Sequence, residues 1–172
     1  MSSKKVFLSL GSNLGDREKN LERAITALES ERVHVTAKSS IYETEPQDVT
    51  GQPWFLNMVA ECETSCFPLQ LLAILHRVER DLGRTRSGAS PRGPRVIDID
   101  ILLFGTAVMQ TSALTIPHPR MNERRFVLEP LLEVAPDLRD PCDKERFSKK
   151  LAGLNGQIVR KLGAAVRVAQ PR

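Results

Sequence analysis

The chain has 172 residues, of which 41% are hydrophobic and 27% charged, a length and composition typical of a soluble globular domain that needs no disulfide or metal staples. The 25 Lys and Arg residues exceed the 21 Asp and Glu residues only slightly, so the net charge of +4 permits nucleic-acid binding without indicating it. No segment is apolar over the length of a bilayer crossing or a signal peptide, and three cysteines without a ligand pattern favour reduced thiols. We therefore expect a cytoplasmic protein.

The first part of the chain predicts a strand, a helix and two further strands, in that order. Residues 6–10 form a short apolar strand, and Asp16 can cap a helix whose apolar positions recur at helical spacing. Alternation and β-forming residues predict a second strand over 33–42 and a third over 55–64. The polar segment 43–54 contains prolines and a glycine and is expected to be a loop.

A second helix is predicted after the third strand. Pro68 suits its first turn, the apolar residues that follow lie on one face, and Gly83 ends it. A polar loop over 84–94 then leads into a fourth strand, which contains Asp98 and Asp100. The order β-α-β-β-α-β is that of a ferredoxin-like α+β sandwich.

The rest of the chain adds elements to this unit. An extra hairpin is expected over 108–115 and a helix near 123–134. From residue 142 onward the chain is polar and basic, with apolar residues at roughly helical spacing, which predicts a final amphipathic helix that caps the sheet. We therefore expect a single domain over 1–172, in which 142–172 are a basic C-terminal helical extension.

The fourth strand carries the most informative pattern of the chain. Asp98 and Asp100 alternate with isoleucines, so the two carboxylates share one face of the strand, about 6–7 Å apart. This spacing suits hard cations such as Mg²⁺, whose coordination phosphate oxygens can complete. Arginines gather in the loop before this strand and again after His118, and together with the carboxylates they suggest phosphoryl-type transfer. A solvated strand face that carries ordinary acids is the alternative.

Three further residues are candidates for binding. The carboxamide of Asn57, on the strand face opposite its apolar neighbours, offers donors and an acceptor that match the edge of a heterocycle. His118 is held between two prolines, and Gly11, at the end of the first strand, could let a ligand ring approach the backbone. Taken alone, Asn57 could equally be a half-exposed polar residue, and His118 a structural one.

Four segments together resemble a known family: 6–15, 55–57, 93–105 and 116–119. In order and spacing they resemble 6-hydroxymethyl-7,8-dihydropterin pyrophosphokinase, an enzyme family of folate biosynthesis, and the resemblance extends over about residues 5 to 140. That family transfers the pyrophosphoryl group of ATP to the hydroxymethyl group of the pterin, giving AMP and the pterin diphosphate. The resemblance implies ATP as co-substrate and two Mg²⁺ ions.

The same resemblance implies roles for particular residues. Arg84, Arg95, Asp98 and Asp100 would be catalytic, and the two aspartates would hold the metal. The residues assigned to the pterin are Gly11, Thr44, Pro46, Gln47, Phe55, Asn57 and Phe126. Those assigned to ATP are Leu72, His76, Glu79, Arg84, Arg86, Arg92, Arg95, Ile101, Thr115, His118 and Arg124. We expect no nucleic-acid or membrane partner, and a monomer or weak dimer.

Two other functions are compatible with the same topology. An RNA-binding module would need aromatic pairs on its central strands, which residues 6–8 and 96–100 do not supply, and acidic residues on that face would repel phosphate unless metal intervenes. A non-catalytic domain that binds a small regulator would have no need of Asp98, Asp100 and two arginine-bearing loops together.

Overall fold

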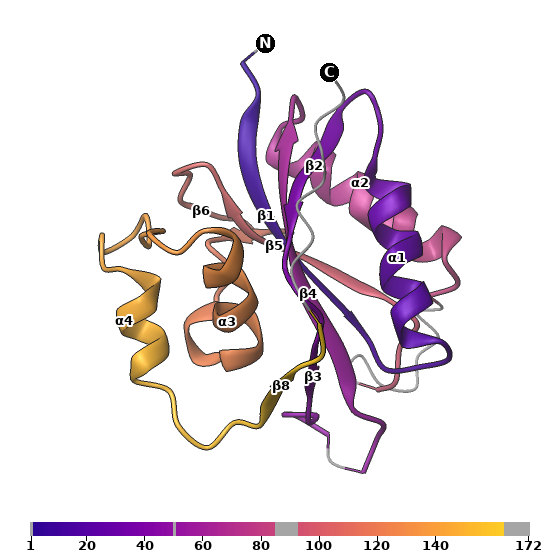
Figure 1. The fold of residues 1–172 in the computed structure, drawn as a ribbon. Coiled ribbons are helices and arrows are strands. Elements are labelled where there is room, and N and C mark those ends of the chain that lie inside the picture. The colour runs from indigo at the N-terminus through magenta and orange to yellow at the C-terminus, as the bar shows by residue number, and fades with distance from the viewer. Residues whose placement is uncertain (1, 50, 85–92, 164–172) are drawn as a thin grey trace.

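Six strands of the described chain form one antiparallel sheet, which is the middle layer of the molecule (Figure 1). The structure is a computed structural model, and it describes residues 2–49, 51–84 and 93–163. The sheet order is β5–β1–β4–β3–β8, and β2 pairs with β4. Its strands are β1 (Lys4–Ser12), β2 (Val33–Lys38), β3 (Tyr42–Thr44), β4 (Phe55–Thr64), β5 (Asp98–Phe104) and β8 (Val159–Lys161). The predicted extra hairpin is confirmed as β6 (Met109–Gln110) paired with β7 (Thr115–Ile116).

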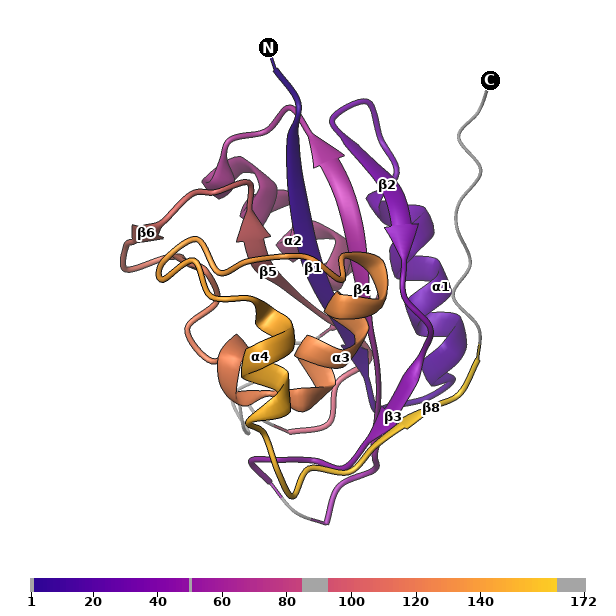
Figure 2. The ribbon, with the colours of Figure 1, turned by 60° about the vertical axis from the view of Figure 1, so that its left-hand side comes forward.

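Helices cover both faces of the sheet (Figures 1 and 2). One face is covered by α1 (Arg17–Leu28) and α2 (Pro68–Asp81), and the other by α3 (Arg125–Val134) and α4 (Phe147–Ala152). The predicted caps are confirmed: Asp16 accepts a hydrogen bond from the Lys19 amide at 3.1 Å, and Pro68 stands in the first turn of α2. In the described ranges, no helix is both long and apolar enough to cross a bilayer.

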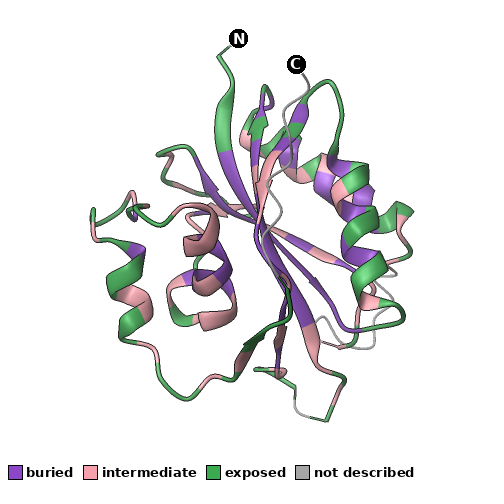
Figure 3. Ribbon diagram, in the orientation of Figure 1, coloured by how far each residue is buried: buried purple, intermediate pink, exposed green. Residues whose placement is uncertain are grey.

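Each face of the sheet buries its own hydrophobic core (Figure 3). The core under α1 and α2 contains the apolar face of β4 predicted from the sequence, namely Leu56, Met58, Ala60 and Cys62. The core under α3 and α4 is built around other side chains of the same strands, and includes Val59 of β4. The alternation along each strand therefore fills two cores at once.

The position of β5 decides which way its carboxylates point. Ile99 and Ile101 are buried in the core under α1 and α2, as the alternation predicted. Asp98 and Asp100 therefore lie on the opposite face, toward α3. Leu102, the next residue on that side, belongs to the core around α3. The carboxylates therefore have an apolar side chain next to them on the same strand face.

The second predicted strand is divided in the structure into β2 and β3. Between them lie Ser39 and Ser40, both buried. The amide and the hydroxyl of Ser40 each donate to Glu133 of α3 at 2.6 Å, and the Tyr42 hydroxyl donates to the same carboxylate. Burial alone would raise the pKa of Glu133, but these hydrogen bonds hold it below its ordinary value. The bonds draw the chain toward α3 and interrupt the strand, so β3 reaches Thr44 and the loop starts only after it.

The expected C-terminal helix is wrong beyond residue 152. α4 ends at Ala152, and Val159–Lys161 form the edge strand β8, which pairs with β3. Ile158 and Leu162, which fitted a helical stripe, are 44% and 50% exposed. The backbone of this segment gains sheet hydrogen bonds at the free edge of β3, and a helix there would leave that edge unpaired. Residues 164–172 of the predicted extension lie outside the described residues.

The predicted helix near 123–134 begins later, at Arg125, after a 3₁₀ turn over Met121–Glu123.

Phe147 tests whether α4 is part of the core. Its side chain is fully buried among residues of β1, β5 and α3. Phe147→Ala should lower the free energy of unfolding by about 3–5 kcal/mol, because the substitution removes buried apolar area and leaves a cavity. Urea denaturation measures this difference, and Phe67→Ala is the control because Phe67 is 61% exposed. A loss below about 1 kcal/mol for Phe147→Ala would show that α4 is not packed as described.

Candidate functional site

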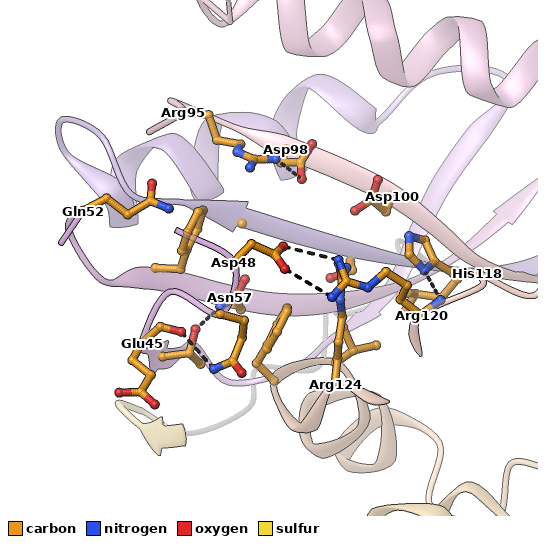
Figure 4. A pocket seen from close by; sticks show the side chains of 18 of the residues that line it. Glu45, Asp48, Gln52, Asn57, Arg95, Asp98, Asp100, His118, Arg120 and Arg124 are labelled. Atoms are coloured by element: carbon orange, nitrogen blue, oxygen red, sulfur yellow. Dashed lines mark hydrogen bonds and ion pairs between the residues drawn. The ribbon is translucent and has the colours of Figure 1, made fainter. Parts of the chain in front are cut away.

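A cavity of about 310 Å³ opens where β1, β4 and β5 face the start of α3 (Figure 4). Residues from segments far apart in the sequence meet there. The predicted site residues that line it are Gly11, Thr44, Gln47, Phe55, Asn57, Arg84, Arg95, Asp98, Asp100, His118, Arg124 and Phe126. The structure thus brings the candidates for catalysis and for pterin binding together in one place.

A second cavity of about 320 Å³ adjoins the first and shares four residues with it: Arg84, Asp98, Asp100 and His118. Its other predicted residues are Leu72, His76, Glu79, Ile101 and Thr115. All five are candidates assigned to ATP. Because Asp98 and Asp100 line both cavities, the carboxylate pair lies at their junction.

Three predicted residues are not brought to the site by the described part of the chain. Pro46 lines neither cavity, whereas its neighbours Glu45 and Gln47 line the first. Arg86 and Arg92 lie outside the described residues.

Asp98 is held by two arginines. Arg84 Nη1 lies 2.7 Å from its Oδ1, and Arg95 Nη1 lies 3.0 Å from its Oδ2. Arg84 also forms an ion pair with Glu79, which is buried on α2. A chain of alternating charges therefore runs from α2 across the start of β5 to Arg95. It neutralises Asp98 and fixes both guanidinium groups at the cavity.

Asp100 is in a less favourable environment for a negative charge. Burial raises its pKa above the ordinary value, the charge of Asp98 raises it further, and the arginines 84, 95 and 124 offset this only in part. A carboxylate in this position gains from a cation beside it. No cluster of three or more His, Cys, Asp or Glu side chains in the described ranges could hold a metal ion. A cation here would use the two aspartates and take its other ligands from a bound molecule or water, as Mg²⁺ commonly does.

Asn57 is fixed from two sides on the wall of the cavity. Its Nδ2 donates to Thr44 Oγ1 at 2.6 Å. On the other side it pairs in register with Gly11, where an added Cβ would lie only 2.9 Å from Asn57 Oδ1. Only glycine leaves room for this carboxamide. The amide is therefore held in one orientation, as recognition of a heterocycle edge requires.

Two phenylalanines in the cavity wall are each covered by an arginine. The Arg95 guanidinium lies 5.7 Å from the ring centroid of Phe55, and that of Arg124 lies 5.5 Å from Phe126. Such cation–π contacts orient both side chains of each pair. The two pairs come from opposite walls, one from β4 and the segment before β5, the other from the start of α3.

His118 is neutral in this environment. Burial lowers its pKa to about 4, and the charge of Arg124 acts in the same direction. Its Nδ1 accepts a hydrogen bond from the Arg120 amide at 3.1 Å (Figure 4), so the ring proton is on Nε2. Its own amide donates to the Leu102 carbonyl of β5 at 3.0 Å, which holds the residue beside the carboxylate strand. His118 can therefore act as a neutral hydrogen-bond donor.

Sequence reasoning missed an ion pair inside the cavity. Arg120 donates through two nitrogens to the carboxylate of Asp48, at 3.2 and 3.3 Å (Figure 4). Asp48 was not distinguishable from any other acid in a polar loop, and the only signal for Arg120 was the cluster of arginines after His118. Other lining residues that were not predicted are Ser9, Glu45, Gln52, Leu102 and Val127 in the first cavity, and Ile99, Thr111, Ser112, Ala113, Leu114 and Pro119 in the second.

Asn13 was also missed, and it connects the two segments that frame the cavity. The residue is buried, and its Nδ2 donates to Gln52 Oε1 and to the Pro53 carbonyl, both at 3.0 Å. Its Oδ1 accepts from the Arg95 amide at 2.8 Å, and its own amide donates to the Arg95 carbonyl at 3.1 Å. Asn13 therefore holds the backbone of Arg95 in place and ties it to the loop before β4.

Residues 7–136 match the family model described as 7,8-dihydro-6-hydroxymethylpterin-pyrophosphokinase (HPPK). The chain belongs to this family. The family predicted from the sequence motifs is thereby confirmed. An HPPK relative from Bacillus subtilis, 2-amino-4-hydroxy-6-hydroxymethyldihydropteridine pyrophosphokinase, is 48% identical over 130 residues, which cover 75% of this chain and 77% of the relative.

Longer HPPK relatives also match. The mitochondrial folate synthesis bifunctional protein of Pisum sativum is 41% identical over 161 residues, which cover 92% of this chain but only 31% of that protein. The chain therefore spans about a third of that relative's length. A crystal structure of Plasmodium falciparum HPPK-DHPS with pteroate has a TM-score of 0.72 at 14% identity, covering 88% of this chain and 44% of that one. This likeness establishes the fold, and it confirms the predicted α+β class.

The neutral state of His118 has a consequence for stability. In the folded protein the pKa of His118 is about 4, whereas in the unfolded chain it has the ordinary value of 6.5. Stability attributable to this residue should therefore fall as the pH is lowered from about 6.5 to 4. His118→Gln should lose less stability than the wild type between pH 7 and 5, as measured by chemical denaturation. An NMR titration of His118 with a midpoint near 6.5 would contradict the buried, neutral assignment.

Proposed function

We propose that this chain transfers the pyrophosphoryl group of ATP to the hydroxymethyl oxygen of 6-hydroxymethyl-7,8-dihydropterin, giving AMP and the pterin diphosphate. The observation that carries the proposal is the location of Asp98 and Asp100. They stand where a cavity with a fixed carboxamide and two aromatic rings meets a second cavity that contains the ATP candidates. Membership of the pyrophosphokinase family supports the same reaction.

In this proposal the first cavity binds the pterin. Asn57, held by Thr44, pairs with the amide–amidine edge of the ring, while Phe55 and Phe126 pack on its two faces. Gly11 gives the ring access to the backbone, and Gln47 borders the same cavity. These contacts direct the hydroxymethyl group toward the carboxylate pair.

The second cavity binds ATP in this proposal. Leu72 and Ile101 contribute apolar surface for the adenine, and Thr115 and His118 lie nearby as hydrogen-bonding groups. The neutral His118 donates its Nε2 proton to a phosphate oxygen. His76 and Glu79 complete the candidates there, Glu79 acting through Arg84.

Arginines bind the phosphates at the junction of the two cavities. Arg84 lines both cavities, Arg95 and Arg124 line the first, and the charges of all three act on Asp100. A planar guanidinium can bond two phosphate oxygens. During transfer, the hydroxymethyl oxygen bonds to the β-phosphorus and its proton is released to solvent. The bond from that phosphorus to the oxygen bridging it to the α-phosphate breaks, and AMP leaves with that oxygen. Arg84 and Arg95 hold the developing negative charge, and the cavity walls keep nucleophile and phosphorus in line.

Asp98 and Asp100 would hold two Mg²⁺ ions. The donor set fits: two carboxylates share a strand face, and burial together with the charge of Asp98 raises the pKa of Asp100 more than the nearby arginines lower it. Once bound, Mg²⁺ supplies neutralisation of the phosphate oxygens and polarisation of the phosphorus that is attacked. Arg84 and Arg95, which pair with Asp98 in the structure, are then available to the phosphates.

Several further properties belong to this proposal. The strand order supports the ferredoxin-like description of the unit formed by β1, α1, β2, β4, α2 and β5, because the four strands lie in the order β5–β1–β4–β2. We also propose a cytoplasmic monomer or weak dimer with no nucleic-acid or membrane partner. The free thiols of Cys62 and Cys66, both buried, support a reducing compartment.

Product analysis tests the proposed reaction. The purified protein, incubated with Mg-ATP and the hydroxymethyl-dihydropterin, should release AMP in a one-to-one ratio with pterin diphosphate. Release of ADP would indicate transfer of a single phosphoryl group and would refute the pyrophosphokinase assignment. Binding of both ligands without any product would favour a regulatory domain.

Asp98→Ala and Asp100→Ala should each lower turnover by about 100-fold or more, because loss of a metal ligand removes several kcal/mol of charge stabilisation in the transition state. Thermal unfolding should show both variants folded. Asp81→Ala is the control, since Asp81 is exposed at the end of α2. Wild-type turnover of both variants at saturating Mg²⁺ would refute the metal assignment, and failure of both to fold would indicate a structural role.

Asn57→Ala should weaken pterin binding by about 5- to 150-fold, because polar groups of the ring would be buried unpaired at a cost of about 1–3 kcal/mol. Binding of a non-hydrolysable ATP analogue should change by less than about twofold. Isothermal titration calorimetry with each ligand measures the two effects. Equal losses for both would contradict the division of the site into a pterin cavity and an ATP cavity.

A further inference from the structure

The segment after residue 136 lies outside the residues that match the family model, yet it contacts α3 and β3, two elements that border the cavity. α4 packs Phe147 into the core beside α3, and β8 pairs with β3 at the edge of the sheet. Figure 2 shows the chain running from α4 past α3 to β8. Gln157 lies in the connection between α4 and β8.

Gln157 makes two hydrogen bonds to the start of α3. Its Oε1 accepts from the Arg125 amide at 2.8 Å, and its Nε2 donates to the Glu123 carbonyl at 2.8 Å. These two peptide groups flank Arg124, which is the N-cap residue of α3 and, among the described contacts, makes no side-chain capping bond itself. Gln157 thus supplies, from a distant segment, an acceptor that the first amides of a helix require.

The turn that Gln157 holds presents two side chains to the cavity. Arg124 and Phe126 both line it, and the guanidinium lies 5.5 Å from the ring centroid. An uncapped first turn frays, and both side chains would then lose their fixed position. We propose that Gln157 is a positioning residue for ligand binding, which fixes the turn that carries Arg124 and Phe126. This rests on the proposed function, in which these two side chains contact ATP and the pterin.

The same segment is anchored on the opposite wall of the cavity. β8 begins at Val159, which pairs in register with Thr44, a lining residue on β3. Lys161 Nζ lies 3.7 Å from the carboxylate of Glu133, on the last turns of α3. The connection therefore spans from the first turn of α3 to β3. Gln157 and the start of β8 are only two residues apart, so the segment that holds the first turn of α3 is itself fixed to β3.

Steady-state kinetics of Gln157→Ala test the proposal, with Asn155→Ala as the control because Asn155 is an exposed amide in the same segment. KM for ATP and KM for the pterin should each rise about 3- to 30-fold in Gln157→Ala, as expected for the loss of one or two hydrogen bonds. kcat should change less than about threefold, and Asn155→Ala should behave as the wild type. Gln157→Glu keeps the acceptor but loses the donor, so its KM values should be intermediate. It also serves as the test variant if Gln157→Ala does not fold.

A double-variant cycle separates positioning from general stability. In an Arg124→Ala background, Gln157→Ala should change KM for ATP by less than about twofold, because its effect passes through Arg124. Unchanged KM values in Gln157→Ala, or the full effect on ATP in the absence of the Arg124 side chain, would overturn the proposal. A lower melting temperature with unchanged KM values would equally overturn it, since a role in stability alone predicts that result.

Hydrogen exchange at the Arg125 amide provides a measurement that does not depend on activity. Exchange should be at least about tenfold faster in Gln157→Ala than in the wild type and unchanged in Asn155→Ala. Equal exchange rates at this amide in Gln157→Ala and wild type would refute the proposal that Gln157 fixes the first turn of α3. A wild-type protein that makes no AMP would refute the proposed function instead, and the exchange rates would still decide whether Gln157 fixes this turn.

Discussion

Two negative charges side by side on β5 are the constraint around which this site is arranged. Asp98 and Asp100 share a strand face between the sheet and α3, where burial strengthens the repulsion of like charges. Arg84 and Arg95 balance Asp98, and Glu79 in turn holds Arg84. The arginines that suit a triphosphate are therefore fixed beside the carboxylates by ion pairs within the protein itself.

Two amide side chains fix the segments that surround Asp98 and Asp100. Asn13 holds the backbone of Arg95 and the loop before β4 through one buried side chain, so the two segments that border the cavity are connected directly. On the opposite wall, Gln157 holds the start of α3 from a segment that lies outside the family match. The strands and α3 thus form the cavity, and two single amide side chains fix the adjoining loops and the first turn of α3.

Local patterns predicted most of the fold and the centre of the site. Alternation of Asp98 and Asp100 with isoleucines is a property of the strand itself, so the faces predicted for these side chains are those found in the structure. The elements that could not be predicted depend on distant partners. Nothing in residues 155–163 indicates the free edge of β3, and an apolar spacing that fits a helix fits a short strand equally well. The Asp48–Arg120 pair and the contacts of Asn13 are likewise formed only when separate segments meet.

The most direct test of the central claim is a crystal structure with a non-hydrolysable ATP analogue and Mn²⁺, with the metal located by anomalous scattering. If the carboxylate pair is a metal site whose arginines are shared with the phosphates, Mn²⁺ should lie about 2 Å from oxygens of both Asp98 and Asp100. Arg84 and Arg95 should then contact phosphate oxygens. Mn²⁺ bound elsewhere, or both arginines still paired with Asp98 while the triphosphate fills its cavity, would contradict the account.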